Sequence, residues 1–176
     1  LADNTIVMYS ADQGFYLGEH GWYDKRFMYE ESLSMPLLMR YPGEIPAGQV
    51  SADMVMNLDF APTFLDLAGV EVPADMQGAS LRNLAGGNSE PAWRQSVYYH
   101  YYEYPHGWHS VRQHYGIRTA THKLINFYGE GDTWELFDLV HDRHELSNVA
   151  SHPEYAETLS RLQRELDELR EQYREE

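Results

Sequence analysis

The chain has 176 residues, which is enough for one domain with a proper hydrophobic core. Its formal net charge of -15, without any basic run, argues against binding to nucleic acid. The absence of cysteine excludes disulfides and thiolate metal sites, and no apolar stretch approaches the roughly 20 residues that a membrane span needs.

The first part of the chain contains two short apolar runs that are separated by loops. Residues 5–10 are apolar and β-branched, and they predict a buried strand of the kind found in parallel sheets. The turn at 11–14 follows at the C-terminal end of this strand, where open α/β sheets bind ligands. A short helix is expected at 27–34, and a second strand at 35–40 with Pro36 at its start.

A longer helix is predicted at 58–68, because apolar residues recur there on one face. Asn57 is a candidate N-cap for this helix, and Gly69 marks its end. Pro62 must lie in the first turn, where the missing N–H of proline leaves no hydrogen bond unmade.

From about residue 96 the sequence changes to short strands separated by tight turns, which predicts a small antiparallel sheet. The expected strands are 96–102, 115–119, 123–128 and 134–138. A long amphipathic helix is expected at the end of the chain, where leucines and tyrosines recur at spacings of four and three residues. Ser151 and Glu154 have the spacing of a capping box at its start. A coiled coil would need a longer run of heptads.

The residues that can carry chemistry follow the first predicted strand. Asp12 and Gln13 offer hard oxygen donors of the type that Ca²⁺ or Mg²⁺ prefers, although two ligands are too few for a complete site. His20 and Lys25 follow on a glycine-bearing loop, and together these groups suit a sulfate or phosphate ester. On spacing alone, an ordinary Asp-Gln-Gly turn with a surface lysine is the simpler interpretation.

The segment 10–43 resembles the type I sulfatases, with the sequence SADQGFYLGEHGWYDKRFMYEESLSMPLLMRYPG. In that family a strand delivers an aspartate followed by an amide or histidine and a glycine, and a GEHG loop and an Asp-Lys pair come next. Further matching motifs are LDFAPT at 58–63, LAG at 67–69, MQGxSL at 76–81, HYGIRT at 114–119, KLI at 123–125, WELFDL at 134–139 and ELxN at 145–148. The resemblance therefore covers nearly the whole chain.

The resemblance implies an alkaline-phosphatase-like α/β fold. Residues 1–92 would form the C-terminal part of the sulfatase catalytic domain, with strands of its main sheet. Residues 93–176 would form the C-terminal subdomain, a small antiparallel sheet packed by the long terminal helix. In addition, the family implies that Asp12 and Gln13 ligate Ca²⁺, with Mg²⁺ as the alternative, and that Lys25 contacts the sulfate group.

Three histidines receive roles from the same resemblance. His20 would have either an active-site role or a role in shaping its loop. The HYGxRT motif resembles a subgroup that acts on sulfated sugars, notably 6-sulfated N-acetylglucosamine, which implies that His114 and His109 lie at the sugar-binding edge. A purely structural role for each histidine is the open alternative.

The family nucleophile is a formylglycine made from Cys or Ser in a Cys/Ser-x-Pro-x-Arg motif. The chain has no cysteine, and the segments beginning Ser34-Met35-Pro36 and Ser89-Glu90-Pro91 lack the required arginine. Since the chain also begins with Leu rather than Met, we expect a fragment that is inactive alone. We also expect an exposed apolar face that packs against the missing N-terminal half of the domain, or that causes self-association.

Other interpretations stay open. A phosphonate or phosphate-ester hydrolase of the same superfamily would differ in its nucleophile, and a noncatalytic remnant would keep only the fold. A zinc site at His141-x-x-His144-Glu145 or His100-x-x-Glu103 lacks a complete ligand set. The sequence does not itself determine the compartment, and the family resemblance implies a periplasmic, extracellular or lysosome-like one.

Overall fold

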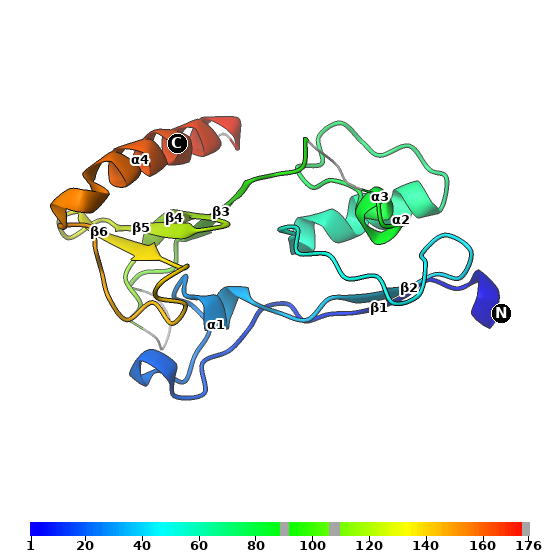
Figure 1. The fold of residues 1–176 in the computed structure, drawn as a ribbon, viewed down its shortest axis with the longest axis horizontal. Coiled ribbons are helices and arrows are strands. Elements are labelled where there is room, and N and C mark those ends of the chain that lie inside the picture. Colours follow the sequence, from blue (N-terminus) through cyan, green and yellow to red (C-terminus); the bar gives the residue numbers. More distant parts are fainter. Residues whose placement is uncertain (89–91, 106–109, 174–176) are drawn as a thin grey trace. The chain divides into compact units, whose positions relative to one another are not determined.

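The computed structural model describes residues 1–88, 92–105 and 110–173, and it divides into two compact units (Figure 1). The first unit comprises residues 1–12 and 35–94, and the second comprises residues 13–34 and 95–176. The sequence-based boundary at 92/93 lies two residues before the one between 94 and 95. The segment 13–34, which we assigned to the first part, packs with the second unit instead.

The first unit contains a two-stranded sheet and short helices. Its elements are η1 (Ala2–Asn4), β1 (Val7–Tyr9), β2 (Leu38–Arg40), η3 (Asn57–Asp59), α2 (Phe60–Leu67) and α3 (Arg82–Ala85). Strand β1 pairs antiparallel with β2, with Met8 opposite Met39. The prediction of a buried strand in a parallel sheet is therefore wrong for these residues. Val7 and Tyr9 are 51% and 63% exposed, because no layer of the described residues covers this side of β1.

The helix predicted at 58–68 forms as η3 followed by α2, and Pro62 lies in the first turn of α2 as predicted. Asn57 is not its cap, because its side chain donates to the backbone carbonyl of Asp12 at 2.7 Å. Asp59 stabilises the start of the helix instead, since its carboxylate accepts the Met56 N–H at 2.7 Å.

Asp59 also joins the helix to the rest of its unit. Its carboxylate accepts hydrogen bonds from the Ala79 N–H and from both terminal nitrogens of Arg94. Leu81, Leu84 and Trp93 form the apolar core beside it. The LDFAPT and MQGxSL motifs thus meet at a buried carboxylate, which gives them a structural role.

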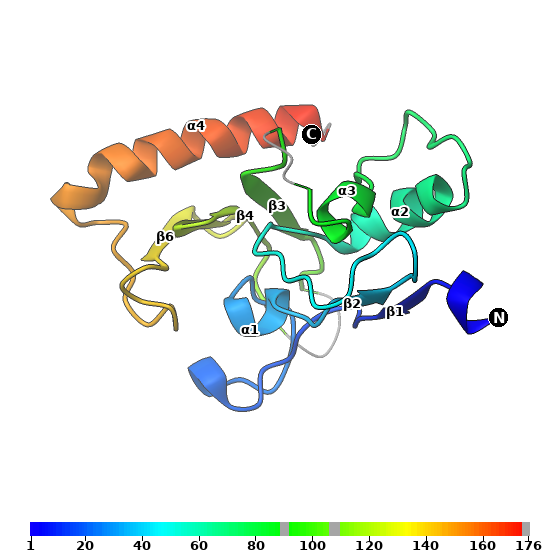
Figure 2. The ribbon, with the colours of Figure 1, turned by 45° about the vertical axis from the view of Figure 1, so that its right-hand side comes forward.

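The second unit is a four-stranded antiparallel sheet in the order β3-β4-β5-β6, as predicted. Its strands are β3 (Ser96–Tyr101), β4 (His114–Thr119), β5 (His122–Phe127) and β6 (Thr133–Asp138). The long helix α4 (Ala156–Gln172) runs along one face of this sheet (Figures 1 and 2). It is preceded by η4 (Pro153–Tyr155), whose N-cap is His152 and has no side-chain capping bond. The predicted capping box at Ser151 is therefore wrong.

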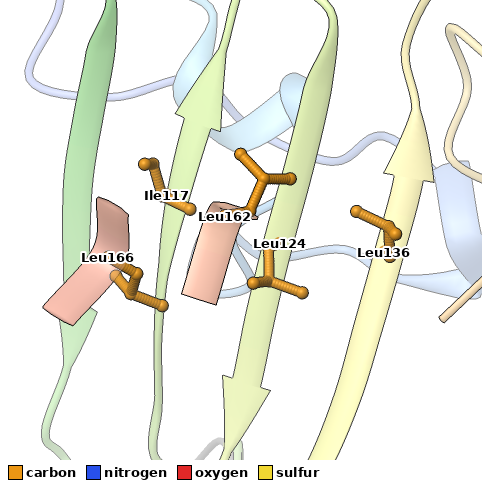
Figure 3. Close-up of a cluster of buried hydrophobic side chains, with 5 residues drawn as sticks. All are labelled: Ile117, Leu124, Leu136, Leu162 and Leu166. Carbon is orange, nitrogen blue, oxygen red and sulfur yellow. The ribbon is translucent and has the colours of Figure 1, made fainter. Parts of the chain in front are cut away.

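Both faces of the sheet are covered, which explains why β5 is almost continuously buried. On one face Ile117, Leu124 and Leu136 of the sheet pack against Leu162 and Leu166 of α4 (Figure 3). The opposite face carries a second apolar cluster, made of Met28, Ile125, Phe127 and Phe137. Met28 belongs to the segment 13–34, which also contains η2 (Glu19–Gly21) and α1 (Glu30–Leu33). This segment is therefore part of the core of the second unit.

Among the described residues, we find no helix with the length and apolar character needed to cross a membrane.

Candidate functional site

The side chain of Gln13 is fixed inside the second unit by its amide nitrogen. This nitrogen donates to the backbone carbonyl of Lys25 at 2.5 Å and to the hydroxyl oxygen of Ser32 at 2.6 Å. The Ser32 hydroxyl in turn donates to the same Lys25 carbonyl at 2.7 Å. The neighbouring Gly14 has no room for a side chain, because an added Cβ would lie 2.0 Å from the Glu31 carbonyl oxygen. The Asp-Gln-Gly motif thus joins two ends of one loop tightly.

The loop between Gln13 and Lys25 folds back on itself. The Tyr16 N–H donates to the Asp24 carbonyl at 2.7 Å, and the Gly18 N–H donates to the Trp22 carbonyl at 2.9 Å. At its base, the Asp24 carboxylate accepts the Lys25 N–H at 2.7 Å and forms an ion pair with Arg26. The backbone that carries Lys25 is therefore held on both sides.

His20 lies at the turn of this loop and packs against aromatic rings. Its φ of 53° is in the left-handed region that non-glycine residues rarely adopt. Its ring stacks on Tyr29 with the centroids 4.3 Å apart, and its Nε2 lies 3.4 Å from a Glu31 carboxylate oxygen. These contacts give His20 a part in shaping the loop, whereas an active-site role stays a prediction.

His114 is fully buried at the start of β4. Its ring stacks on Phe27, Tyr99 and Tyr101, and its Nδ1 lies 2.8 Å from the carbonyl oxygen of Arg112. Burial lowers its pKa to about 4, so the ring is neutral at physiological pH. The structure thus gives His114 a core environment, and its contact with a sugar stays a prediction. His109 lies outside the described residues.

Asp12 is exposed and belongs to the first unit, where its backbone carbonyl accepts the Asn57 side chain. In the part of the chain that the structure describes, no group of three or more His, Cys, Asp or Glu side chains is arranged to hold a metal ion. The nitrogens of His100, named in one zinc alternative, instead lie 3.1 Å and 2.7 Å from the hydroxyls of Tyr98 and Tyr128. A metal centre would need ligands beyond Asp12 and Gln13.

A buried ion cluster connects the same loop to the sheet, and sequence reasoning missed it. The ammonium of Lys123 lies 2.6 Å from Glu145 and 2.9 Å from Glu30, and Arg118 lies 3.1 Å from Glu30. The second oxygen of Glu145 accepts the Glu30 N–H at 2.7 Å. The available signal was the lysine directly before the apolar residues Leu124 and Ile125 of a predicted strand, since a buried lysine requires a charged partner.

The two glutamates of this cluster respond to it differently. Burial raises the pKa of Glu145, and the nearby Lys123 offsets this only in part. Burial would also raise the pKa of Glu30, but Lys123 and Arg118 together outweigh it and lower that pKa. Glu30 begins α1, so the cluster fixes the helix that follows Lys25 against the sheet.

Gly116 of β4 allows the segment 13–34 to approach the sheet closely. A Cβ at this position would lie 2.3 Å from the Leu124 carbonyl oxygen and 2.6 Å from the Met28 sulfur. The HYGIRT motif therefore supplies a core histidine, a contact glycine and the arginine of the ion cluster. These three residues contribute to the packing and ion pairing between the sheet and the loop.

A model of the family described as "N-sulphoglucosamine sulphohydrolase, C-terminal" matches residues 18–172. The chain belongs to the sulfatase family. This confirms the family resemblance found in the sequence, and with it the alkaline-phosphatase-like α/β fold of the solved relatives. The matched residues contain the part of the loop from Gly18 onward, the ion cluster and the four-stranded sheet described above.

Individual sulfatases and related enzymes are similar over most of this chain. An N-acetylglucosamine-6-O-sulfatase of Bacteroides thetaiotaomicron is 54% identical over 98% of the chain and 31% of its own length. Human arylsulfatase K is 37% identical over 85% of the chain and 28% of its own length. The chain thus spans about a third of the length of these relatives.

Solved structures give the same result for the fold. A protein in complex with its substrate D-glucosamine-2-N,6-O-disulfate has a TM-score of 0.94 and 54% identity, over 98% of this chain and 35% of its own. A phosphonate monoester hydrolase of Silicibacter pomeroyi has a TM-score of 0.85 and 29% identity, over 97% of this chain and 35% of its own. The fold is therefore shared by hydrolases of two ester classes.

Proposed function

We propose that this chain is the C-terminal part of a sulfatase that hydrolyses sulfate esters of sugars, with a 6-sulfated glucosamine derivative as its substrate. The observation that carries this proposal is the 54% identity, over 98% of the chain, to an N-acetylglucosamine-6-O-sulfatase. A structural relative with the same identity binds D-glucosamine-2-N,6-O-disulfate as its substrate. Such glycans occur mainly outside the cytoplasm, so a periplasmic, extracellular or lysosome-like site suits this proposal.

In this proposal Lys25 contacts the sulfate group of the substrate. A lysine ammonium stabilises negative charge that develops on the sulfate or on the leaving oxygen. The loop geometry supports this role, because both sides of the Lys25 backbone are held by hydrogen bonds. His20 shapes the same loop, while His114 and His109 are proposed to act at its sugar-binding edge.

Asp12 and Gln13 are proposed to give two oxygen ligands to Ca²⁺, with Mg²⁺ as the alternative. The donor chemistry fits, because a carboxylate and an amide oxygen are ligands that both ions prefer. The amide nitrogen of Gln13 is already used by Lys25 and Ser32, so a cation would take the oxygen. When bound, the cation would supply positive charge that polarises the sulfate ester.

The chain alone is proposed to be inactive, because residues 1–176 contain no cysteine and no Ser-x-Pro-x-Arg motif. The formylglycine nucleophile and the remaining metal ligands would come from an N-terminal half of the same domain. The exposed β1 and β2 residues Val7, Tyr9 and Leu38 are proposed to pack against that half, or against another copy of the chain when it is absent.

The test is to sequence the DNA upstream of Leu1, and to assay the protein encoded by any continuous reading frame. We expect a Cys/Ser-x-Pro-x-Arg motif and turnover of N-acetylglucosamine-6-sulfate. Lys25→Ala should lower turnover, whereas Arg161→Ala on α4 should not. Turnover of a sulfate ester by the 176-residue chain itself would contradict the proposed inactivity.

A phosphonate or phosphate-ester hydrolase is the second candidate, favoured by the TM-score of 0.85 to a phosphonate monoester hydrolase. The same assay distinguishes it, if a phenyl phosphonate ester is offered beside the sulfated sugar. Faster turnover of the phosphonate would replace the first proposal. A reading frame without any nucleophile would favour a noncatalytic remnant.

A further inference from the structure

Three successive backbone carbonyls around Lys25 are each held by a side-chain donor. The Lys25 carbonyl accepts from Gln13 and Ser32, at 2.5 Å and 2.7 Å. The next carbonyl, of Arg26, accepts the hydroxyl of Tyr99 at 2.8 Å, and that of Phe27 accepts the hydroxyl of Tyr16 at 2.8 Å. We call these donors, Gln13, Ser32, Tyr99 and Tyr16, the carbonyl clamp.

Two of the four donors of the clamp are fully buried and two are half-buried, so its hydrogen bonds are partly shielded from water. Tyr16 and Ser32 are fully buried. Burial raises the pKa of Tyr99 to about 12, although a hydrogen bond with Gln13 lowers it in part, so the hydroxyl keeps its proton near neutral pH. A buried carbonyl that loses its donor pays the full cost of its desolvation. The path of residues 25–27 is therefore set by side chains and not by a strand ladder.

Tyr99 lies on β3 of the four-stranded sheet, far from the loop in sequence. Its ring packs on His114 with the centroids 5.7 Å apart, and its hydroxyl alone reaches the loop backbone. The packing role and the hydrogen-bonding role of Tyr99 can thus be separated by a change to phenylalanine.

We propose that Tyr99 is a positioning residue, which acts with Gln13, Ser32 and Tyr16 to fix the backbone of Lys25 and hence the place of its ammonium group. This inference rests on the proposed function only in the assumption that Lys25 contacts the substrate sulfate. Through the Tyr99 hydroxyl the antiparallel sheet helps to fix the position of Lys25.

The experiment compares Tyr99→Phe with the wild-type 176-residue chain by NMR. Tyr98→Phe is the matched control, because Tyr98 lies on the same strand but packs against the α4 side of the sheet, where its hydroxyl lies 3.1 Å from His100. The first readout is the hydrogen-exchange rate of the Lys25 N–H. The second is the signal of ¹³C-dimethylated Lys25, which can be resolved because the chain has only two lysines and the other, Lys123, is fully buried.

We expect Tyr99→Phe to speed exchange of the Lys25 N–H about 5-fold, the factor that corresponds to one ordinary hydrogen bond, and to shift the dimethyl-Lys25 signal. Tyr98→Phe should change neither, and the dimethylated amino group of Leu1 is the internal reference. Faster exchange with an unmoved Lys25 signal would mean that Tyr99 has only a structural role. Unchanged exchange would mean that the Tyr99 hydroxyl does not fix the Lys25 backbone.

If Tyr99→Phe does not fold, Ser32→Ala tests the same clamp by removing one donor to the Lys25 carbonyl. It should shift the Lys25 signal in the same way, and an unmoved signal would overturn the proposal. Neither readout depends on catalysis. A failed sulfatase assay with a positive NMR result would therefore reject the proposed function and leave the clamp intact.

Discussion

Lys123 and Glu145 form an ion pair in which both side chains are completely buried, with the ammonium nitrogen 2.6 Å from a carboxylate oxygen. Glu145 also accepts the backbone N–H of Glu30, the first residue of α1. The pair thus joins β5, the loop after β6 and the segment that carries Lys25. Its position explains why the KLI and ELxN motifs occur together in this chain.

Removal of one partner should destabilise the protein strongly, since the other charge would be left buried without compensation. We expect Lys123→Met to lower the free energy of unfolding by about 3 to 5 kcal/mol, measured by urea denaturation. Arg161→Ala, which breaks a surface pair 3.4 Å from Glu165, should cost less than about 1 kcal/mol. Equal losses of unfolding free energy for the two variants would show that the buried Lys123 pair contributes no more to stability than a surface pair.

Asp138 should make the protein less stable in acid. Burial alone would raise its pKa, but hydrogen bonds from His141, Tyr155 and the Val140 N–H outweigh this and lower the pKa to about 2. A depressed pKa gives stability that is present above the unfolded value near 4 and is lost as the pH falls toward 2. We expect about 1 to 2 kcal/mol of stability to disappear in this range.

The measurement for Asp138 is the free energy of unfolding of Asp138→Asn and of the wild type between pH 6 and pH 2. The difference between them should shrink as the pH falls through this window. Tyr155→Phe removes one of the hydrogen bonds, made at 2.9 Å, and should show a smaller change of the same sign. A difference that stays constant with pH would contradict this assignment.

Gly116→Ala should destabilise the second unit, because the new methyl group would meet the backbone of β5. The added carbon would lie 2.3 Å from a backbone oxygen that cannot move without disturbing the strand. We expect a loss of about 3 kcal/mol in the free energy of unfolding. Gly131→Ala has nothing within 4 Å of its added carbon, so it should cost less and only through its φ of 89°. The opposite ranking would exclude close packing as the cause.

Chemical acetylation should distinguish the two lysines of the folded chain. Lys123 can react only after unfolding, since it is fully buried, whereas Lys25 is only partly buried. We expect Lys25 to be modified at least about 100 times faster, measured by mass spectrometry of tryptic peptides. In denaturant the two rates should become equal, and comparable rates in the native protein would contradict the buried ion cluster.

Calcium should bind weakly to the 176-residue chain, because the two proposed ligands, Asp12 and Gln13, would supply only two of the six to eight oxygen ligands that the ion takes. We expect a dissociation constant above about 1 mM by isothermal titration calorimetry. Asp12→Asn should weaken this binding further, because it removes the one charged ligand of the proposed pair. Micromolar binding that Asp12→Asn abolishes would mean that the chain holds a complete site by itself.

The sequence predicted the second unit well, because its signals are local. The strands of the sheet and the leucines of α4 pack against each other, so the surfaces that their sequence patterns imply are covered within this chain. The first unit was predicted less well at β1, where the apolar run 5–10 favoured a buried parallel strand. In the structure Met8 faces Met39 of an antiparallel neighbour, since β2 is the partner within reach.

The family motifs were found in the sequence, but the structural role of each residue within a motif was not. His114 looked like a sugar-binding residue and lies in an aromatic core, while Gly116 and Arg118 of the same motif serve packing and the ion cluster. The starts of two helices were also predicted wrongly. The Asn57 side chain donates to the carbonyl of Asp12, and the N-cap of η4 is His152 instead of Ser151.

The sequence by itself determined the family, the strands of the antiparallel sheet and the terminal helix, because these depend on residue type and on periodicity along the chain. Only the tertiary structure decided that Lys123 meets Glu145 and Glu30, and that Tyr99 reaches the carbonyl of Arg26. These contacts join residues between 22 and 93 positions apart. Their partners are selected by the packing of the loop 13–34 against the sheet, which no local pattern in the sequence describes.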